Sequence, residues 1–252
     1  YHYDKGLNLN DLGYLWRDDY SQTKVGLKFQ TMESWNFIRN TSVILEGDAE
    51  ENTDGLDLGK TIEFSYDIEL DNFWEIGGGF YKIMEHYDDR KIILPYKRNE
   101  FGPPIIIPEV LEFNFNITTD KHRTFWGSFS SSWAHNKRDD IGQEQYAELN
   151  YRPNPYIRFT TSYNRYRLIK QYHWLETISE QDGNHHIFSN LNRKMDIINF
   201  RATGNINRKL SLQGYLEIFS NYDIIDSYSE YISDRNLYDP NSPYILGEGA
   251  WV

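Results

Sequence analysis

Strict alternation of apolar and polar side chains constrains this chain more than any other feature. It is clearest at residues 56–70, where only Lys60 interrupts an apolar series. The series is Leu56, Leu58, Ile62, Phe64, Tyr66, Ile68 and Leu70. Because successive side chains of a strand point to opposite faces, this period predicts strands with one apolar and one polar face.

The same alternation recurs along the chain at residues 111–118, 125–133, 198–206 and 210–218, and more weakly at 25–31, 147–151 and 157–163. These segments predict about ten strands, with an eleventh near residues 7–16. Most are longer than the roughly 5–6 residues of ordinary strands and closer to the 9–11 of a tilted membrane strand.

The predicted connections alternate between two length classes. Short turns fall at residues 32–34, 71–72, 119–122, 152–155 and 207–209, and longer polar connections at 47–55, 88–108, 136–142, 177–190 and from 223 onward. In an up-and-down meander, alternate connections emerge at the same end, so one end would carry tight turns and the other long loops. We therefore predict an all-β fold, an antiparallel up-and-down transmembrane (outer-membrane) β-barrel of which the chain holds an incomplete part.

Aromatic residues are placed as membrane-interface girdles would require. Trp35, Trp74, Trp126 and Tyr156 follow short turns, whereas Trp133 and Trp174 lie toward the long-loop ends. Amphipathic rings prefer the headgroup level, so we expect these six residues at the two interfaces with outer-membrane lipid. The cations Lys60, Lys82 and Arg165 interrupt the apolar series about eight or more residues from the short turns, where long side chains can snorkel.

Acidic residues dominate the predicted inner face. The chain carries 38 Asp and Glu against 26 Lys and Arg, a net charge of −12, which argues against nucleic acid as a partner. The inward candidates are Asp57, Glu63, Asp67, Glu69, Glu112, Glu148 and Glu217. Such a lumen would disfavour anions and favour cations or neutral polar solutes such as sugars. For surface contact with a glycan ligand we expect the loops at residues 87–108 and 177–190.

No catalytic constellation is visible in the sequence. The chain has no cysteine, and neither HExxH nor GxSxG occurs. The glycines at 77–79 precede no helix and indicate a bend or close approach in a strand, and His185 with His186 lacks a third ligand at metal-like spacing. We expect no catalytic residue, no metal site and no cofactor.

Two other functions remain open. A soluble, secreted β-sandwich acting as a carbohydrate-binding module would also show alternating strands. A barrel-embedded hydrolase is the second alternative, although no triad can be recognised.

Two stretches of the sequence resemble a known family. They are residues 10–20, and residues 171–172 through 187–192, the second followed by Phe200-Arg201 and residues 210–215. They resemble the C-terminal β-barrel domain DUF5916 of Bacteroidetes-type envelope proteins, which usually follows an N-terminal carbohydrate-binding family 9-like domain. The resemblance implies one barrel domain over residues 1–252, the C-terminal part of a longer chain, in the outer membrane of a Gram-negative bacterium. It also implies that a sugar-binding domain of the same chain is a partner, and it supplies no catalytic residues.

Overall fold

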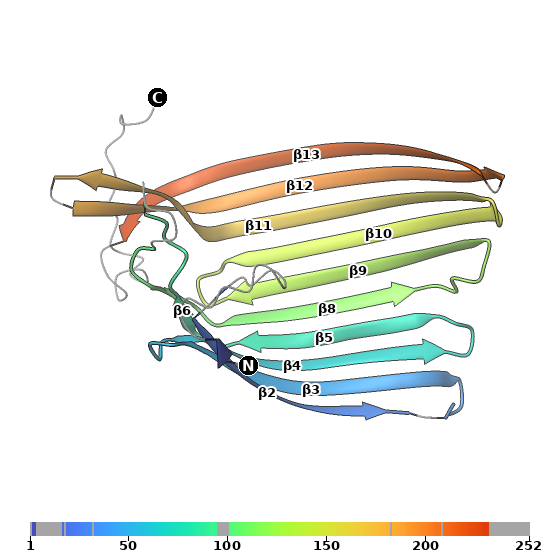
Figure 1. The fold of residues 1–252 in the computed structure, drawn as a ribbon, viewed down its shortest axis with the longest axis horizontal. Coiled ribbons are helices and arrows are strands. Elements are labelled where there is room, and N and C mark those ends of the chain that lie inside the picture. Colours follow the sequence, from blue (N-terminus) through green and yellow to red (C-terminus); the bar gives the residue numbers. More distant parts are fainter. Residues whose placement is uncertain are drawn as a thin grey trace.

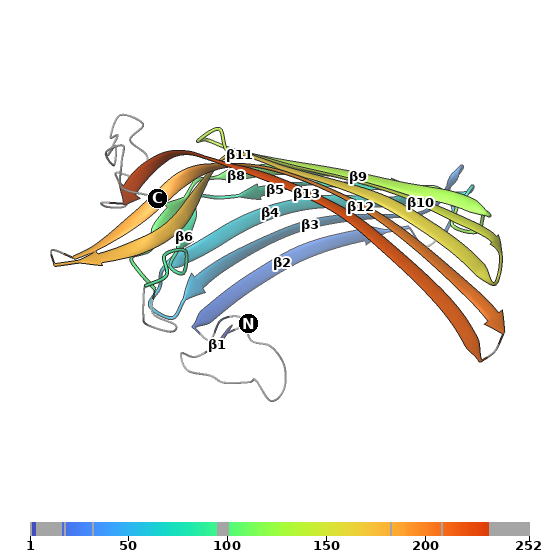
Figure 2. The same cartoon turned by 90° about the horizontal axis from the view of Figure 1, so that it is seen from above.

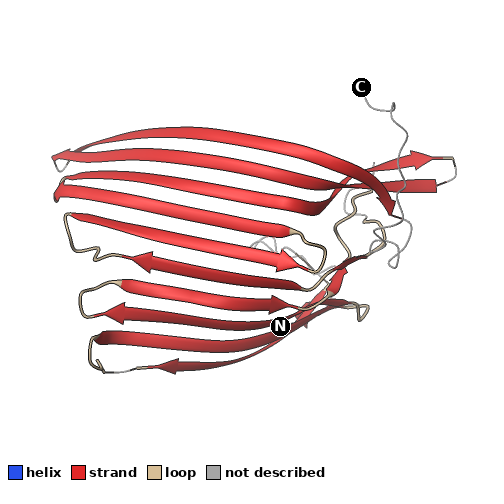
Figure 3. Cartoon of the chain, turned by 180° about the vertical axis from the view of Figure 1, so that it is seen from behind, coloured by secondary structure: helices blue, strands red, loops and turns tan. Residues whose placement is uncertain are grey.

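The computed structural model describes residues 2–3, 17, 19–31, 33–94, 101–181, 183–207 and 209–231. All regular structure in these residues is β-strand, as Figure 3 shows. None of the described residues forms a helix long and apolar enough to cross a membrane. The predicted all-β class is therefore confirmed.

Thirteen strands follow one another along the chain. They are β1 (His2–Tyr3), β2 (Tyr20–Gln30), β3 (Ile38–Asn52), β4 (Asp57–Leu70), β5 (Glu75–Ile83), β6 (His86–Asp88), β7 (Ile105–Ile107), β8 (Val110–Thr118), β9 (Phe125–Asn136), β10 (Ile141–Asn154), β11 (Ile157–Glu180), β12 (Gly183–Asn207) and β13 (Leu210–Tyr231). Eleven of them form one sheet in the order β1-β2-β3-β4-β5-β8-β9-β10-β11-β12-β13, and β6 and β7 form a separate pair.

Each strand of the large sheet pairs antiparallel with the next one, so the sheet is a meander (Figure 1). The turns β2–β3, β4–β5, β8–β9, β10–β11 and β12–β13 all lie at one end, which we call the turn end. A long excursion leaves from the opposite end, between β5 and β8, and contains β6 and β7. The placement of the short turns agrees with the sequence pattern.

The other predicted long connections are shorter than expected. Strands β3, β11, β12 and β13 continue through residues that the sequence suggested as loops, and β11 and β12 reach 24 and 25 residues. Only a four-residue link separates β3 from β4, and another separates β9 from β10. In β12 the extension is buried on both faces, with Ile187 3%, Phe188 0% and Ser189 1% exposed, so apolar and polar residues do not alternate there and leave no period-two signal.

The described strands do not close into a barrel. The sheet bends into an arch (Figure 2), with β2 and the two-residue β1 at one edge and β13 at the other. In the part of the chain that the structure describes, the predicted incomplete barrel is thus an open sheet. The eleventh strand expected near residues 7–16 lies outside the described residues.

Close packing against β5 explains its run of glycines. A Cβ atom on Gly77 would lie 2.5 Å from Asn116 Oδ1, and one on Gly78 would lie 2.8 Å from the carbonyl oxygen of Asn114. The hydroxyl of Tyr66, the residue of β4 that pairs with Gly78, lies 2.9 Å from the same position. The close approach predicted for residues 77–79 is confirmed.

Candidate functional site

The register gives the large sheet two chemically distinct faces. One row of paired residues crosses five strands from β3 to β9 and consists of Leu45, Phe64, Phe80, Phe113 and Trp133. The next row, one residue along, consists of Glu46, Glu63, Tyr81, Glu112 and Ala134. Because side chains alternate along each strand, the first row belongs to an apolar face and the second to a polar face.

The polar face is the hollow one. A depression of about 560 Å³ is lined both by Lys28 of β2 and by Tyr146 of β10, which lie far apart in the sheet order. Asp67, Asn116 and Ser130 form its floor between them. Polar side chains therefore line the concave side of the arch, and the apolar face is convex.

Six of the seven predicted inward carboxylates lie on this concave face: Glu63, Asp67, Glu69, Glu112, Glu148 and Glu217. Asp57 lies at the first residue of β4, where its carboxylate forms an ion pair with the Lys60 ammonium. Glu69 binds Arg39 at 2.8 Å, and the Tyr215 hydroxyl lies 2.5 Å from Glu217.

Further charges on the concave face follow the same alternation but were not singled out from the sequence. The acidic ones are Glu46, Asp48, Glu50, Glu75 and Glu144, and the basic ones are Lys24, Lys28, Arg158, Arg193 and Arg201. Their position relative to the apolar residues of each strand is the signal that identifies them. The lumen-like face is therefore acidic overall, with cations interspersed.

The six predicted interface aromatics occupy four kinds of position. Trp35 and Tyr156 are 72% and 65% exposed at the turn end, where Trp74 also lies, and Trp133 belongs to the apolar face. Trp126 instead pairs with Asn150 on the concave face, and Arg158 stacks on its ring at 5.9 Å. Trp174 packs against a buried cluster at the opposite end of the sheet.

That opposite end is covered by the excursion between β5 and β8, residues 84–94 and 101–109, which we call the cap segment. A cavity of about 430 Å³ is lined by Lys91 and Ile107 of the cap segment, by Glu112 and Tyr172 of the sheet, and by Asp140 in the link between β9 and β10. The cap segment therefore lies over the concave face, and burial raises the pKa of the Asp140 carboxyl beneath it.

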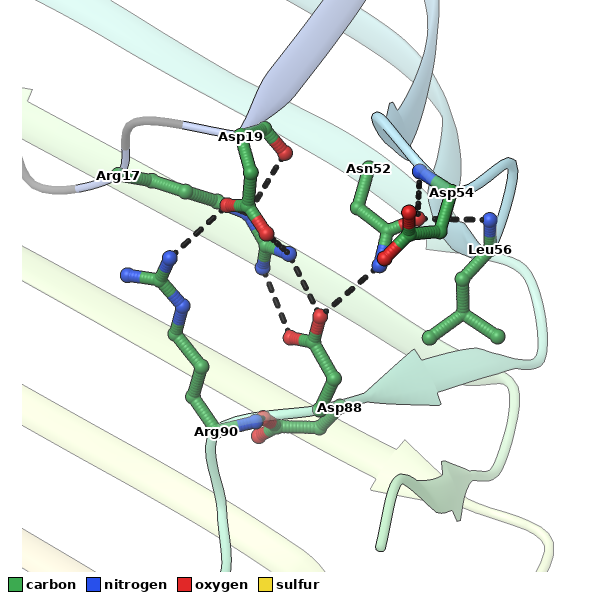
Figure 4. A network of polar contacts seen from close by, with 8 residues as sticks. Arg17, Asp19, Asn52, Asp54, Leu56, Asp88 and Arg90 are labelled. Atoms are coloured by element: carbon green, nitrogen blue, oxygen red, sulfur yellow. Dashed lines mark hydrogen bonds and ion pairs between the residues drawn. The ribbon is translucent and has the colours of Figure 1, made fainter. Parts of the chain in front are cut away.

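One side of the cap segment is fixed by charges (Figure 4). The buried Arg17 guanidinium donates two hydrogen bonds to the Asp89 carboxylate, at 2.8 and 2.6 Å, and Asn52 Nδ2 donates a third at 3.1 Å. Arg90 donates to Asp19 at 2.9 Å. Burial raises the Asp89 pKa, but the hydrogen bond and charge of Arg17 lower it more, so the pKa lies below its ordinary value.

The other side is fixed by apolar packing. Ile92 and Ile105 of the cap segment form a buried cluster with Phe188 of β12 and Tyr231 of β13. The Tyr231 hydroxyl donates to the Pro104 carbonyl at 3.2 Å. The two regions that the sequence suggested for ligand contact, 87–108 and 177–190, thus pack against each other.

His186 is buried beside this cluster. Its Nδ1 lies 3.0 Å from the Thr177 hydroxyl, which donates to the Ile93 carbonyl of the cap segment at 3.0 Å. Burial lowers the His186 pKa below its ordinary value. The neighbouring His185 contacts Glu230 at 2.6 Å. The sequence placed this histidine pair in the long polar connection at residues 177–190. That prediction is wrong, because both residues belong to β12.

No group of three or more potential metal ligands is present in the described part of the chain. Instead, the concave face offers hydroxyls, amides and carboxylates held by mutual hydrogen bonds. Asn150 is an example: its Nδ2 donates to Glu148 at 2.6 Å, and its Oδ1 accepts from Thr160 at 2.9 Å. Such a surface presents hydrogen-bond donors and acceptors on neighbouring strands.

The fold and this surface define the class of protein: an all-β meander of one large antiparallel sheet, polar on its hollow side and apolar on the other. The chain belongs to the family described as a domain of unknown function, DUF5916, whose model matches residues 2–233. This match confirms the family that the sequence motifs resemble. No curated protein and no solved structure matches the chain.

Proposed function

We propose that the chain is the greater part of an outer-membrane β-barrel of a Gram-negative bacterium, with lipid on its convex face and water on its concave face. The observation that carries this proposal is the exposure of large apolar side chains across the convex face. Val25 near one edge is 70% exposed, Phe113 in the middle 52% and Leu212 near the other edge 68%. Soluble monomers rarely expose apolar patches larger than a few hundred Å².

The alternative of a soluble β-sandwich needs a second sheet to cover this face. Apart from the large sheet, the described strands include only β6 and β7, of three residues each. That pair contributes to the cap segment on the polar side. Lipid therefore accounts for the apolar face better than a second protein layer does.

The charged side chains on the convex face form ion pairs and lie far from the turn end, as a lipid-facing surface requires. Arg165 binds Asp196 at 3.0 Å and Lys82 binds Glu109 at 3.1 Å. Arg165 lies eight residues beyond Ile157, the first residue of β11, or roughly 26 Å along the strand. With ordinary strand tilt, this is near the far edge of an apolar band about 25 Å tall.

Membrane embedding also requires every backbone group in the apolar layer to be paired. The proposal therefore demands that β2 and β13, the edges of the described sheet, be joined through further strand pairing. The concave face would then line a lumen, with the cap segment across one mouth.

For the lumen we propose a role in binding or uptake of glycans at the cell surface, together with a sugar-binding domain of the same chain. Hydroxyl, amide and carboxylate groups arranged on strands give neutral polar solutes many hydrogen-bond partners. A hydrolytic role has no comparable support.

Heat modifiability tests the membrane proposal. The chain, expressed with its native flanks, is extracted from the outer-membrane fraction and run on SDS gels with and without boiling. We expect extraction only with detergent and a band that shifts on heating, because a closed, fully paired barrel resists SDS. A chain that stays monomeric and soluble without detergent would contradict the proposal.

A further inference from the structure

Near the turn end of β10–β12, the concave face holds a depression of about 540 Å³ that differs from the rest of the acidic surface. Two guanidinium groups, of Arg158 on β11 and Arg201 on β12, line it together with Trp126 and Tyr215. Arg158 pairs with Thr203 and Arg201 with Thr160, so the two arginines are diagonal neighbours on one face. Diagonal neighbours have Cβ atoms roughly 7–8 Å apart, within reach of a common ligand for side chains of this length.

Both guanidinium groups rest on aromatic rings rather than on carboxylates. Arg158 lies 5.9 Å from the centre of the Trp126 ring, and Arg201 lies 5.6 Å from that of Tyr215. Within the described residues neither forms an ion pair, whereas Arg193 on the same face binds Asp223 at 2.8 Å. Ring stacking orients a planar guanidinium and leaves its N–H donors available.

The carboxylates nearby are already engaged. Glu148 accepts from the Tyr146 hydroxyl at 2.7 Å and from Asn150 at 2.6 Å, and Glu217 lies 2.5 Å from the Tyr215 hydroxyl. Tyr215 also lies 2.6 Å from Asn199 Oδ1. These hydrogen bonds engage both carboxylates, of which Glu148 itself lines the depression, and they fix its polar floor.

We propose that this depression binds the carboxylate of an acidic saccharide, with Arg158 and Arg201 as donors to the carboxylate and the amide and hydroxyl floor as partners of the sugar ring. A planar guanidinium matches a carboxylate with two parallel hydrogen bonds, which a lysine cannot provide. The proposal rests on the glycan role proposed for the lumen. It adds to that role one binding site and the negative charge of the saccharide.

The test uses the full chain, folded in detergent, and titrates it with trigalacturonate and with the methyl ester of the same trisaccharide. The quench of tryptophan fluorescence near Trp126 reports binding, and calorimetry provides a second readout. We expect the ester to bind about tenfold or more weakly, because it keeps the size and hydroxyls but loses the charge-assisted hydrogen bonds.

Three variants locate the site. Arg158→Gln and Arg201→Gln should each weaken trigalacturonate binding about tenfold and leave binding of the ester unchanged. Arg39→Gln is the matched control, since Arg39 is also at the turn end but binds Glu69. Each variant must retain the SDS-resistant, heat-modifiable band, which separates a lost contact from a lost fold.

Equal binding of acid and ester, or unchanged binding in both arginine variants, would overturn the site. Binding of a sulfated trisaccharide or of inorganic phosphate without binding of trigalacturonate would overturn its assignment to a sugar carboxylate. Any of these results in a heat-modifiable protein leaves the membrane proposal intact, so the two failures can be told apart.

Discussion

At the scale of single residues, the close contacts of β5 make Gly78 sensitive to any side chain. We expect Gly78→Ala to lower the free energy of unfolding by about 1–3 kcal/mol, because the added methyl would overlap a backbone carbonyl that cannot rotate away. Gly214→Ala is the control, as nothing lies within 4 Å of a Cβ there. Urea unfolding of both variants in lipid vesicles measures the difference. Equal stability of the two would mean that β5 can move away from Asn114.

The two faces of a single strand give a second residue-scale comparison. Phe64 and Ser65 are adjacent in β4 and point to the convex and concave faces. In a membrane, Phe64→Arg should destabilise the protein by about 2–4 kcal/mol, since a cation on the lipid face must leave water. Ser65→Arg should cost far less because its side chain stays solvated. Similar losses from both substitutions, measured by unfolding in vesicles, would argue against lipid on the convex face.

At the scale of elements, the cap segment should loosen in two stages as the pH falls. The pKa of His186 is lowered by burial, so its stabilising contribution is present above the ordinary value of 6.5 and declines as the pH falls below it. The pKa of Asp89 is also lowered in the folded state, so its contribution persists until the pH falls below the ordinary value of 3.8. Limited proteolysis within residues 84–109 should therefore accelerate first below pH 6.5 and again below 3.8.

Variants separate the two stages. His186→Gln should remove the first increase, because a glutamine at this buried position takes up no proton over this pH range. Asp89→Asn should accelerate cleavage already at neutral pH, since Arg17 would lose one of its two carboxylate partners and keep only Asp19, at a cost of about 2 kcal/mol. A cleavage rate that does not change with pH in the unmodified protein would show that neither residue anchors the cap segment.

The strands and their faces could be predicted from the sequence because alternation is local. The alternation around Phe64, Phe113 and Trp133 predicts the face on which each side chain lies, and strand pairing brings the three into one row. The cap segment could not be predicted, because its contacts join distant residues: Thr177 reaches Ile93 over 84 positions, and Tyr231 reaches Pro104 over 127. No local pattern marks such pairs.

The candidate site shows the same division. Glu63 and Glu148 follow from alternation, and so does the concave position of Trp126, which lies between Phe125 and Gly127 of the convex face. The clustering of aromatics after short turns suggested an interface position for Trp126 instead. Alternation cannot predict which residues of two strands become neighbours. Arg158 and Arg201 are diagonal neighbours only because of the β11–β12 register.

At the scale of the whole molecule, the summed charge of the concave face should decide which ions enter a closed lumen. Carboxylates outnumber cations there, and the Arg158–Arg201 pair is confined to the turn end of β11–β12. A potential that is negative over most of the lumen attracts cations, and narrow walls of low dielectric constant strengthen it. We therefore expect the protein, reconstituted in planar bilayers with a KCl gradient, to give a reversal potential of the sign for K⁺ preference.

Neutralising inward carboxylates should weaken that preference. Glu63→Gln with Glu112→Gln removes two charges from one row across β4 and β8, which should shift the reversal potential toward zero. Glu180→Gln, at the exposed tip of β11, removes a charge of the same kind outside the lumen and should leave the potential unchanged. Arg158→Gln should shift it the opposite way, toward stronger K⁺ preference. Chloride preference in the unmodified protein would mean that the two arginines, rather than the acidic rows, control passage.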